Sequence, residues 1–207
     1  MDTYVYSIED NFETAKTIYV NLTNKCTNSC IFCIRRTVDN IKGKKMWLEN
    51  EDFQAKDVIK QFEKCKNMEE VVFCGYGEPF MKFDLIKGIA SYLKEKGIKV
   101  RINTNGIGNA INGRNVIPEI KNLVDEISIS FNAPTKEQYD EISKPIYPDA
   151  YEEMKKFAQL CVENDIDTTL SVVTNHPDYQ LDLQACEDYA NSIGAKFRVR
   201  EWLNNGY

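Results

Sequence analysis

NKCTNSCIFCIR (Asn24–Arg35) contains three of the chain's seven cysteines and directly follows the apolar stretch TIYVNLT (17–23). Thiolates spaced four and three residues apart can enclose one small inorganic centre, either zinc or an iron–sulfur cluster. Structural zinc commonly takes four ligands in two pairs, whereas the single histidine, His176, is far away and no second cysteine pair exists. A four-iron cluster held by three cysteines leaves one iron open to a cofactor or a substrate. The spacing therefore favours a reactive iron–sulfur centre.

The chain of 207 residues, with 43% hydrophobic and 28% charged residues, is long enough to bury one core. We expect a single domain over residues 1–207, because no linker, repeat or low-complexity tract divides it. The start, MDTYVYSIED, lacks the basic and apolar parts of a secretory signal, and no run is long enough to cross a bilayer. A cytoplasmic location, reduced thiols and no membrane partner are therefore expected. The net charge of −6 argues against general affinity for nucleic acids.

One stretch, RRTVDNIKGKK (35–45), departs from this acidic balance. Its basic residues, set against the single acidic residue Asp39, are Arg35, Arg36, Lys42, Lys44 and Lys45. The stretch is either a solvated basic loop or an anion-binding patch. As a patch it would receive an anionic substrate or an acidic electron donor such as flavodoxin.

Strand candidates rich in β-branched and aromatic residues alternate with helical patterns along the chain. The strands are expected at 17–23, 71–74, 99–103, 126–131, 168–173 and 195–200. Most read as continuous apolar runs, which is typical of parallel strands buried on both faces. TYVYSI (3–8) can add a hairpin or an edge strand, whereas NGIGNAINGRN (105–115) reads as a loop. Right-handed crossovers between such strands predict an α/β fold, a partial (β/α)6 TIM-like barrel of parallel strands.

The four cysteines outside the cluster are expected to be structural. Cys65, Cys161 and Cys186 fall on apolar helical stripes and are interpreted as small core residues. Cys74 ends the second expected strand beside the site, and core packing is the favoured interpretation there too.

Unusual residues gather directly after the expected strand ends. In a parallel barrel these loops share one face, where active sites lie. After the cysteines they carry GYGEP (75–79), TNG (104–106), NAP (132–134), TNHPD (174–178) and EWLNN (201–205). His176 in the fifth loop is either a general acid or base, or an ordinary loop residue beside Pro177. The six loops together indicate an active site on that face.

These motifs resemble the radical S-adenosylmethionine (SAM) superfamily. Cys26, Cys30 and Cys33, with Phe32 before the last, resemble its CxxxCxxC signature, and GYGEP resembles its glycine-rich motif for the methionine part of SAM. The six-unit pattern is similar to that superfamily's partial barrel. YVNLTNKCTNSCIFCIR, FCGYGEP, ISISFNAP and FRVREW also resemble the small TatD-associated subfamily, named for its link to TatD-type metal-dependent hydrolases.

The resemblance implies a role for each matching residue. The three cysteines would hold three irons of a [4Fe-4S] cluster, and the amino and carboxylate groups of SAM would bind the fourth. Gly75, Tyr76 and Gly77 would bring backbone close to SAM, and Glu78 would accept a hydrogen bond from its ammonium group. A plain glycine-rich turn between strand and helix is the alternative.

Residues after the third and fourth strands would complete the SAM site. Ser130 matches the ribose-binding position and Asn132 the position at the methionine carboxylate, and strand alternation would put both on one face. Thr104 and Asn105 are further candidates for the methionine end, although NTNG is also an ordinary turn.

Four more positions extend the implied site. Phe32 would present its backbone to the adenine, and Val172 or Val173 would pack against the adenine ring or belong to the core. One of Arg198 and Arg200 should face the barrel interior and bind a carboxylate or phosphate of a cofactor or an anionic substrate. Arg200, nearer the active face, is favoured.

The resemblance therefore implies a radical SAM enzyme that cleaves SAM reductively and abstracts hydrogen from an unidentified substrate. It would need a one-electron donor such as flavodoxin or ferredoxin, and a TatD-type hydrolase is a candidate partner. Two alternatives remain open at this point. One is a non-catalytic zinc or nucleic-acid-binding module using the same thiols and the basic loop, and the other is a regulator that binds cluster and SAM without turnover.

Overall fold

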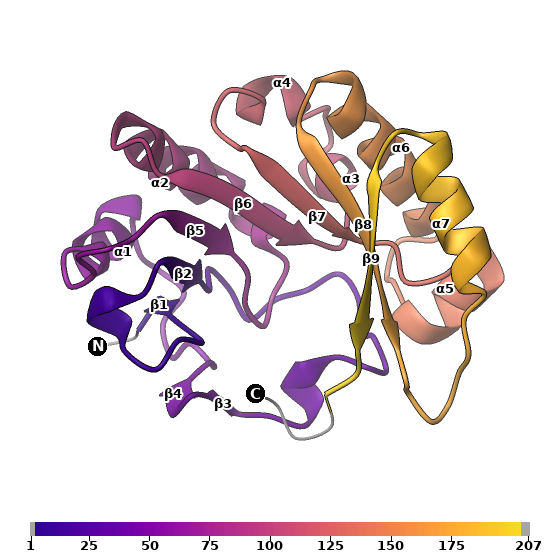
Figure 1. The fold of residues 1–207 in the computed structure, drawn as a ribbon, viewed down its shortest axis with the longest axis horizontal. Helices are drawn as coiled ribbons and strands as arrows, with labels where there is room; N and C mark the ends of the chain where they lie inside the picture. Colours follow the sequence, from indigo (N-terminus) through magenta and orange to yellow (C-terminus); the bar gives the residue numbers. More distant parts are fainter. Residues whose placement is uncertain (1–2, 204–207) are drawn as a thin grey trace.

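The structure, a computed structural model, describes residues 3–203. Its centre is a seven-stranded sheet in the order β1-β2-β5-β6-β7-β8-β9, curved into an open partial barrel (Figure 1). The strands are β1 Val5–Tyr6, β2 Thr17–Val20, β5 Glu70–Phe73, β6 Lys99–Thr104, β7 Glu126–Ser130, β8 Asp167–Thr174 and β9 Lys196–Glu201. Neighbouring strands in the run β2-β5-β6-β7-β8-β9 pair in parallel, and β1 pairs antiparallel with β2 at the edge. The expected partial barrel and the extra edge strand are both confirmed.

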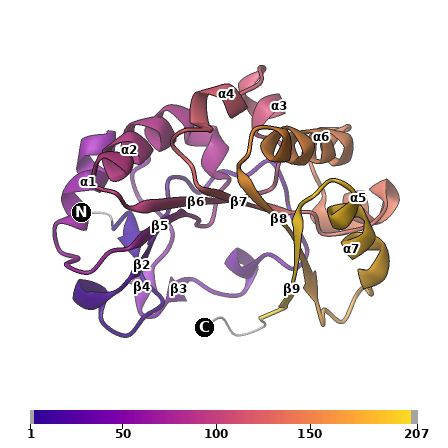
Figure 2. The ribbon, with the colours of Figure 1, turned by 45° about the horizontal axis from the view of Figure 1, so that its top comes forward.

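Helices connect the parallel strands and lie along the outer, convex side of the sheet (Figure 2). They are α1 Ala55–Phe62, α2 Phe83–Glu95, α3 Gly108–Asn112, α4 Ile117–Ile120, α5 Lys136–Ser143, α6 Ala150–Glu163 and α7 Leu183–Ser192. The short helix α3 lies in the stretch expected to be a loop, so that prediction was wrong. Packing explains it, because Ile107 and Val116 on either side of α3 are fully buried and anchor the turn to the core.

The two faces of the sheet differ in polarity, which corrects the expectation of strands that are apolar on both faces. Side chains facing the helices are fully buried and apolar; they include Val71, Phe73, Val100, Ile102, Ile127, Ile129, Leu170 and Val172. The alternate positions face the concave interior and are largely polar; they include Arg101, Asn103, Ser128, Ser171 and Arg198. The hydrophobic core therefore lies between sheet and helices, and the barrel interior is a polar space.

The segment between β2 and α1 crosses the concave side of the sheet (Figures 1 and 2). It contains a hairpin of β3 Asn40–Ile41 and β4 Lys44–Lys45, whose turn residues Lys42 and Gly43 have φ of 48° and 74°. A second, smaller apolar cluster of Tyr6, Ile41, Met46 and Tyr76 fastens this segment to the sheet. No helix among residues 3–203 has both the length and the apolar character required to span a membrane.

Candidate active site

The cysteine loop, residues 21–33, is held on one side by the glycine turn, residues 75–77. A Cβ added to Gly75 would lie 2.1 Å from Oδ1 of Asn21, and one added to Gly77 would lie 2.3 Å from the carbonyl oxygen of Thr23. The N–H of Glu78 donates to the carbonyl of Lys25 at 2.8 Å. The two glycines thus allow the cysteine loop itself to approach, and the Cβ direction expected to face SAM is filled by the protein's own atoms.

The C-terminal end of α5 holds the other side of the cysteine loop. The amide of Ser29 donates to the carbonyl of Ser143 at 3.0 Å, and the amide of Ile31 donates to that of Ile142 at 2.9 Å. The amide of Ile146 donates in turn to the carbonyl of Thr27 at 2.9 Å. This support joins segments more than 100 residues apart, and no local pattern in the sequence indicated it.

Arg35 and Arg36 of the basic stretch brace the cysteine loop. The guanidinium of Arg35 donates to the carbonyls of Asn24 and Tyr76 at 3.2 and 3.3 Å, and to that of Asn28 at 3.3 Å. Arg36 donates to the carbonyl of Ser29 at 3.1 Å. These two side chains tie the cysteine loop to the glycine turn, so they are not parts of a free anion-binding patch.

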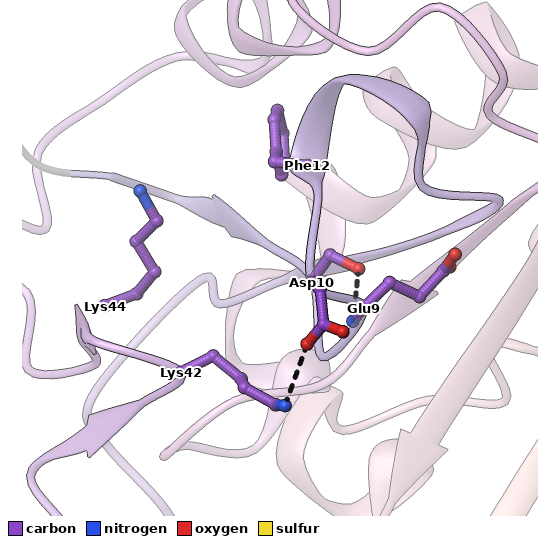
Figure 3. Close-up of a pocket in the computed structure, with 6 residues that line it drawn as sticks. Glu9, Asp10, Phe12, Lys42 and Lys44 are labelled. Carbon is purple, nitrogen blue, oxygen red and sulfur yellow. Dashed lines mark hydrogen bonds and ion pairs between the residues drawn. The ribbon is translucent and has the colours of Figure 1, made fainter.

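The lysines of the same stretch have acidic neighbours. Lys42 pairs with Asp10 at 3.2 Å and Lys45 with Glu49 at 2.7 Å (Figure 3 shows the first pair). Lys42 and Lys44 border a hollow of ≈ 180 Å³ whose lining also includes Glu9 and Asp10. Charges of both signs meet there, so the interpretation as a solvated loop is favoured over an anion-binding patch.

The three thiols lie within electrostatic range of one another. Burial, and then the charge of Glu78, raise the pKa of Cys26 to about 11, although Arg35 opposes the shift. Burial, followed by the neighbouring thiols of Cys33 and Cys26, raises the pKa of Cys30 to about 12. Metal binding would therefore have to displace protons from these thiols.

The thiols do not gather around a single point. Among residues 3–203, no three His, Cys, Asp or Glu side chains are grouped so that they could hold one metal ion. Ligands of one zinc ion must all reach the same centre, whereas each thiolate on a four-iron cluster binds a different iron.

Glu78 is the centre of a buried network that unites three of the predicted residues. Its side chain is only 2% exposed. Its carboxylate accepts hydrogen bonds from the hydroxyl of Thr104 at 2.7 Å, the amide of Asn105 at 2.7 Å and the amide of Phe80 at 3.1 Å. The side-chain amide of Asn105 continues the network to the hydroxyl of Thr27 in the cysteine loop at 2.8 Å. Both oxygens of the predicted ammonium acceptor are therefore already engaged by the protein.

The stability of the protein should depend on pH through Glu78. Burial raises its pKa to about 7, against the opposing effect of its three donors. Because the folded pKa lies above the ordinary value, folding favours the protonated form, and stability falls as pH rises through this interval. The unfolding free energy of the natural protein, relative to Glu78→Gln, should drop by roughly 2–3 kcal/mol between about pH 5 and 8. Urea denaturation of both proteins across this range measures the difference.

Glu119→Gln is the matched control for this experiment. Arg114 and Lys87 lower the pKa of the exposed Glu119 to about 2, so its ionisation is complete before the tested range begins. This control should keep the natural pH slope. Equal slopes in the natural protein and Glu78→Gln would show that Glu78 does not titrate there.

Asn132 is brought to the thiols by a route that strand alternation did not predict. It lies beyond the end of β7 with φ of 65°, so its side chain does not continue the alternation of Ser130. Its amide donates to the hydroxyl of Ser143 at 3.0 Å, and that hydroxyl in turn lies beside the thiol of Cys30. The Oδ1 atom of Asn132 is buried and has no hydrogen-bond partner among residues 3–203. A buried acceptor without a donor fits a site whose cofactor supplies the donor.

Two residues of the predicted site have side chains that pack in apolar clusters. The ring of Tyr76 belongs to the smaller apolar cluster, and its hydroxyl donates to the carbonyl of Val38. Burial, followed by the charges of Asp39 and Cys33, raises the pKa of Tyr76 to about 12. Val172 is fully buried in the main core, which favours its core interpretation over contact with adenine.

An aromatic cluster that sequence reasoning missed joins the cysteine loop to the loop after β8. The ring of His176 stacks on Tyr179 at 5.0 Å and lies 4.5 Å from Trp202, and its Nδ1 accepts from the amide of Asp178. Phe32 meets Tyr179 edge-on at 6.0 Å. His176 is therefore a packed and largely buried side chain.

Both arginines of β9 lie on the concave face, which corrects the expectation that only one would. They are two residues apart, and their partners in the sheet register are Ser171 for Arg198 and Val173 for Arg200. Arg198 donates to the hydroxyl of Ser128 across the interior at 2.7 Å.

The cysteines outside the cysteine loop have two kinds of environment. Cys161 and Cys186 are fully buried in the core, as predicted, and the thiol of Cys65 donates to the carbonyl of Ala15 at 3.2 Å while packing against that core. The prediction that Cys74 packs in the core was wrong, because Cys74 lies on the concave face within electrostatic range of Arg200.

Comparison with known proteins decides the family of this site. A sequence profile of the Radical SAM superfamily matches residues 20–185, which include the cysteine loop and every strand from β5 to β8. The chain belongs to the radical SAM superfamily. Members of this superfamily are generally enzymes that use a [4Fe-4S] cluster and SAM.

Relatives of this radical SAM chain are distant in sequence. Uncharacterized protein MJ0804 of Methanocaldococcus jannaschii is 27% identical over 121 residues, which make up 58% of this chain and 35% of that protein. Among solved structures, TYW1 with a lysine-pyruvate adduct bound superposes with a TM-score of 0.64 at 14% identity, covering 91% of this chain and 65% of that one.

Two further structures share the fold. SuiB of Streptococcus suis has a TM-score of 0.62 at 18% identity, and the superposed part covers 92% of this chain and 40% of the SuiB chain. Native anSMEcpe with bound AdoMet has a TM-score of 0.59 at 14% identity, with coverages of 90% and 51%. The chain thus spans about a third of the curated relative and 40–65% of these structures.

Proposed function

We propose that this chain is a radical SAM enzyme whose [4Fe-4S] cluster is bound by Cys26, Cys30 and Cys33. The observation that carries the proposal is the cysteine loop, which presents three neighbouring thiols near the Oδ1 of Asn132, a buried acceptor with no donor among the described residues 3–203. When bound, the cluster and SAM supply reductive cleavage of SAM to methionine and a 5′-deoxyadenosyl radical, which abstracts hydrogen from an unidentified substrate.

The chain's own residues would hold and orient these groups. The glycine turn, Arg35 and the end of α5 hold the backbone of the cysteine loop in place. Asn132 offers an unused carbonyl oxygen to a donor such as the SAM ammonium or a ribose hydroxyl. This site is supported by the buried hydrogen-bond network of Glu78, Thr104 and Asn105. Ser130 at the end of β7 remains a candidate ribose contact.

The finer placement of the enzyme rests on sequence resemblance. We infer membership of the TatD-associated subfamily from the four stretches that resemble it, with a TatD-type hydrolase as candidate partner. Flavodoxin or ferredoxin would supply the electron, and an oxygen-sensitive cluster suits a reducing cytoplasm. A regulator that binds cluster and SAM without turnover is the alternative, because the residues that hold these groups need not also turn over a substrate.

Anaerobic reconstitution with iron and sulfide, followed by reduction in the presence of SAM, tests the proposal. We expect about four irons and four sulfides per chain and the formation of 5′-deoxyadenosine. Bound zinc without sulfide would support the zinc module instead. A full cluster that binds SAM but releases no 5′-deoxyadenosine would favour the regulator.

A further inference from the structure

The concave face of the sheet carries three arginines whose charges are unequally compensated. Arg101 pairs with Glu70 at 3.1 Å and lies 4.0 Å from Glu126, which gives its charge two carboxylate neighbours. Arg198 and Arg200 on β9 have no ion pair with any residue in 3–203. Two positive charges therefore lie side by side without a counterion from the described chain.

The position of the Arg198 side chain costs free energy that its contacts within residues 3–203 do not fully offset. Its Nη2 donates to Ser128, but its Nε is buried and has no acceptor in the part of the chain that the structure describes. Burial, and then the positive charges of Arg200 and Arg101, lower the pKa of its guanidinium. Buried donors without acceptors are rare in folded proteins, and an unpaired buried charge is more costly still. An anion at this position would satisfy the free donor and the charge together.

The surroundings suit an anionic ligand and lie near the thiols. The hydroxyls of Ser128 and Ser171, 4% and 1% exposed, flank Arg198 on the neighbouring strands. Arg200 lies within electrostatic range of Tyr179, which is itself within range of Cys30. The arginine pair thus lies on the concave face of β9, at the end of the sheet that carries the cysteine loop, with Arg198 half-buried and Arg200 exposed.

We propose that Arg198 and Arg200 bind a carboxylate or phosphate group of the substrate and so place an anionic molecule in the barrel interior. The reaction that follows rests on the proposed function, but the anion site itself does not. Guanidinium groups bind both kinds of oxyanion through paired N–H donors, and the buried Nε–H of Arg198 is among its donors that have no acceptor within residues 3–203. This assigns to Arg200 a role toward substrate in place of its predicted role toward the cofactor.

Calorimetric titration of the full chain with inorganic phosphate and, separately, with malonate tests the site. The protein is kept free of SAM, in a chloride buffer of matched ionic strength, and no cluster is required. We expect saturable binding of at least one probe, and the preferred probe distinguishes a phosphate substrate from a carboxylate one. Arg198→Gln should weaken that binding about tenfold or more, because it removes charge-assisted hydrogen bonds.

Two further variants keep the test decisive. Arg114→Gln, which alters an exposed arginine paired with Glu119 on the helical side, should bind the probe as the natural protein does. Arg198→Lys keeps the charge without the paired donors, so it should bind more weakly than the natural protein even if Arg198→Gln fails to fold.

Three results would overturn the proposal. The first is the absence of saturable binding of either probe, and the second is unchanged probe binding in the folded Arg198 variants. The third is a loss of SAM affinity in the cluster-loaded variants that equals their loss of probe affinity, which would assign the pair to the cofactor's own carboxylate. Failure of the proposed function has a different signature. A chain that binds phosphate or malonate through Arg198 but forms no 5′-deoxyadenosine would retain the anion site and lose only the radical chemistry.

Discussion

Cys30→Ala is expected to yield a folded protein that assembles no [4Fe-4S] cluster and forms no 5′-deoxyadenosine. Each corner of the cluster needs its own thiolate, and the described chain offers no other cysteine near Cys30 apart from Cys26 and Cys33. Iron and sulfide analysis after anaerobic reconstitution, together with chromatography of the SAM cleavage products, measures both losses.

Cys161→Ala is the matched control for this prediction. Cys161 is fully buried on α6 in the hydrophobic core, away from the cysteine loop. Its loss should cost roughly 1–2 kcal/mol of stability through a small cavity, while iron, sulfide and SAM cleavage stay at natural levels. A Cys30→Ala protein with a full cluster and natural turnover would contradict the ligand assignment.

Gly77→Ala is expected to destabilise the protein by about 3 kcal/mol or more and to prevent cluster assembly. The added Cβ would lie 2.3 Å from the carbonyl oxygen of Thr23 and 2.4 Å from that of Lys25. Both are backbone atoms, so the clash cannot be relieved by rotating a side chain. Relief requires the cysteine loop to move, and its thiols would move with it. Chemical denaturation and iron analysis measure the two effects.

Gly88→Ala separates this clash from a general effect of the substitution. Gly88 lies within α2, and its added Cβ would meet only the Cβ of Ala55 at 3.3 Å. Alanine also favours a helix over glycine by up to about 1 kcal/mol, so this variant should be near natural stability and bind a full cluster. Natural stability and cluster content in Gly77→Ala would show that the cysteine loop does not depend on the glycine turn.

The prediction of the fold succeeded where the signal was local. The parallel strands of the main sheet were marked by β-branched or aromatic residues, and α1, α2, α6 and α7 by apolar residues at helical spacing, whereas α5 and the short strands β3 and β4 were not predicted. Errors arose at α3, where packing and not local preference makes the helix, and at the inner face of the sheet. Residues such as Arg101 and Ser128 looked like interruptions in apolar runs, but they line a polar barrel interior.

Several of the residues predicted for the site lie close together, but the orientation of their side chains was not predicted. Glu78, Thr104 and Asn105 do converge, although Glu78 is engaged by the protein's own donors. Tyr76 and Val172 face apolar clusters because the directions of their side chains depend on which segments pack above them. A single sequence does not contain that information for segments far apart along the chain.

By itself, the sequence determined the family, the parallel α/β architecture and the three thiols, because spacing along the chain specifies all three. Only the tertiary structure decided how these thiols are presented. The cysteine loop is braced by a glycine turn about 50 residues away and by the end of α5 more than 100 residues away. Likewise, only the curvature of the sheet set Arg198 and Arg200 on its concave face without an ion pair to any residue in 3–203. Burial and charge compensation depend on neighbours in space, and the chain order of residues does not specify them.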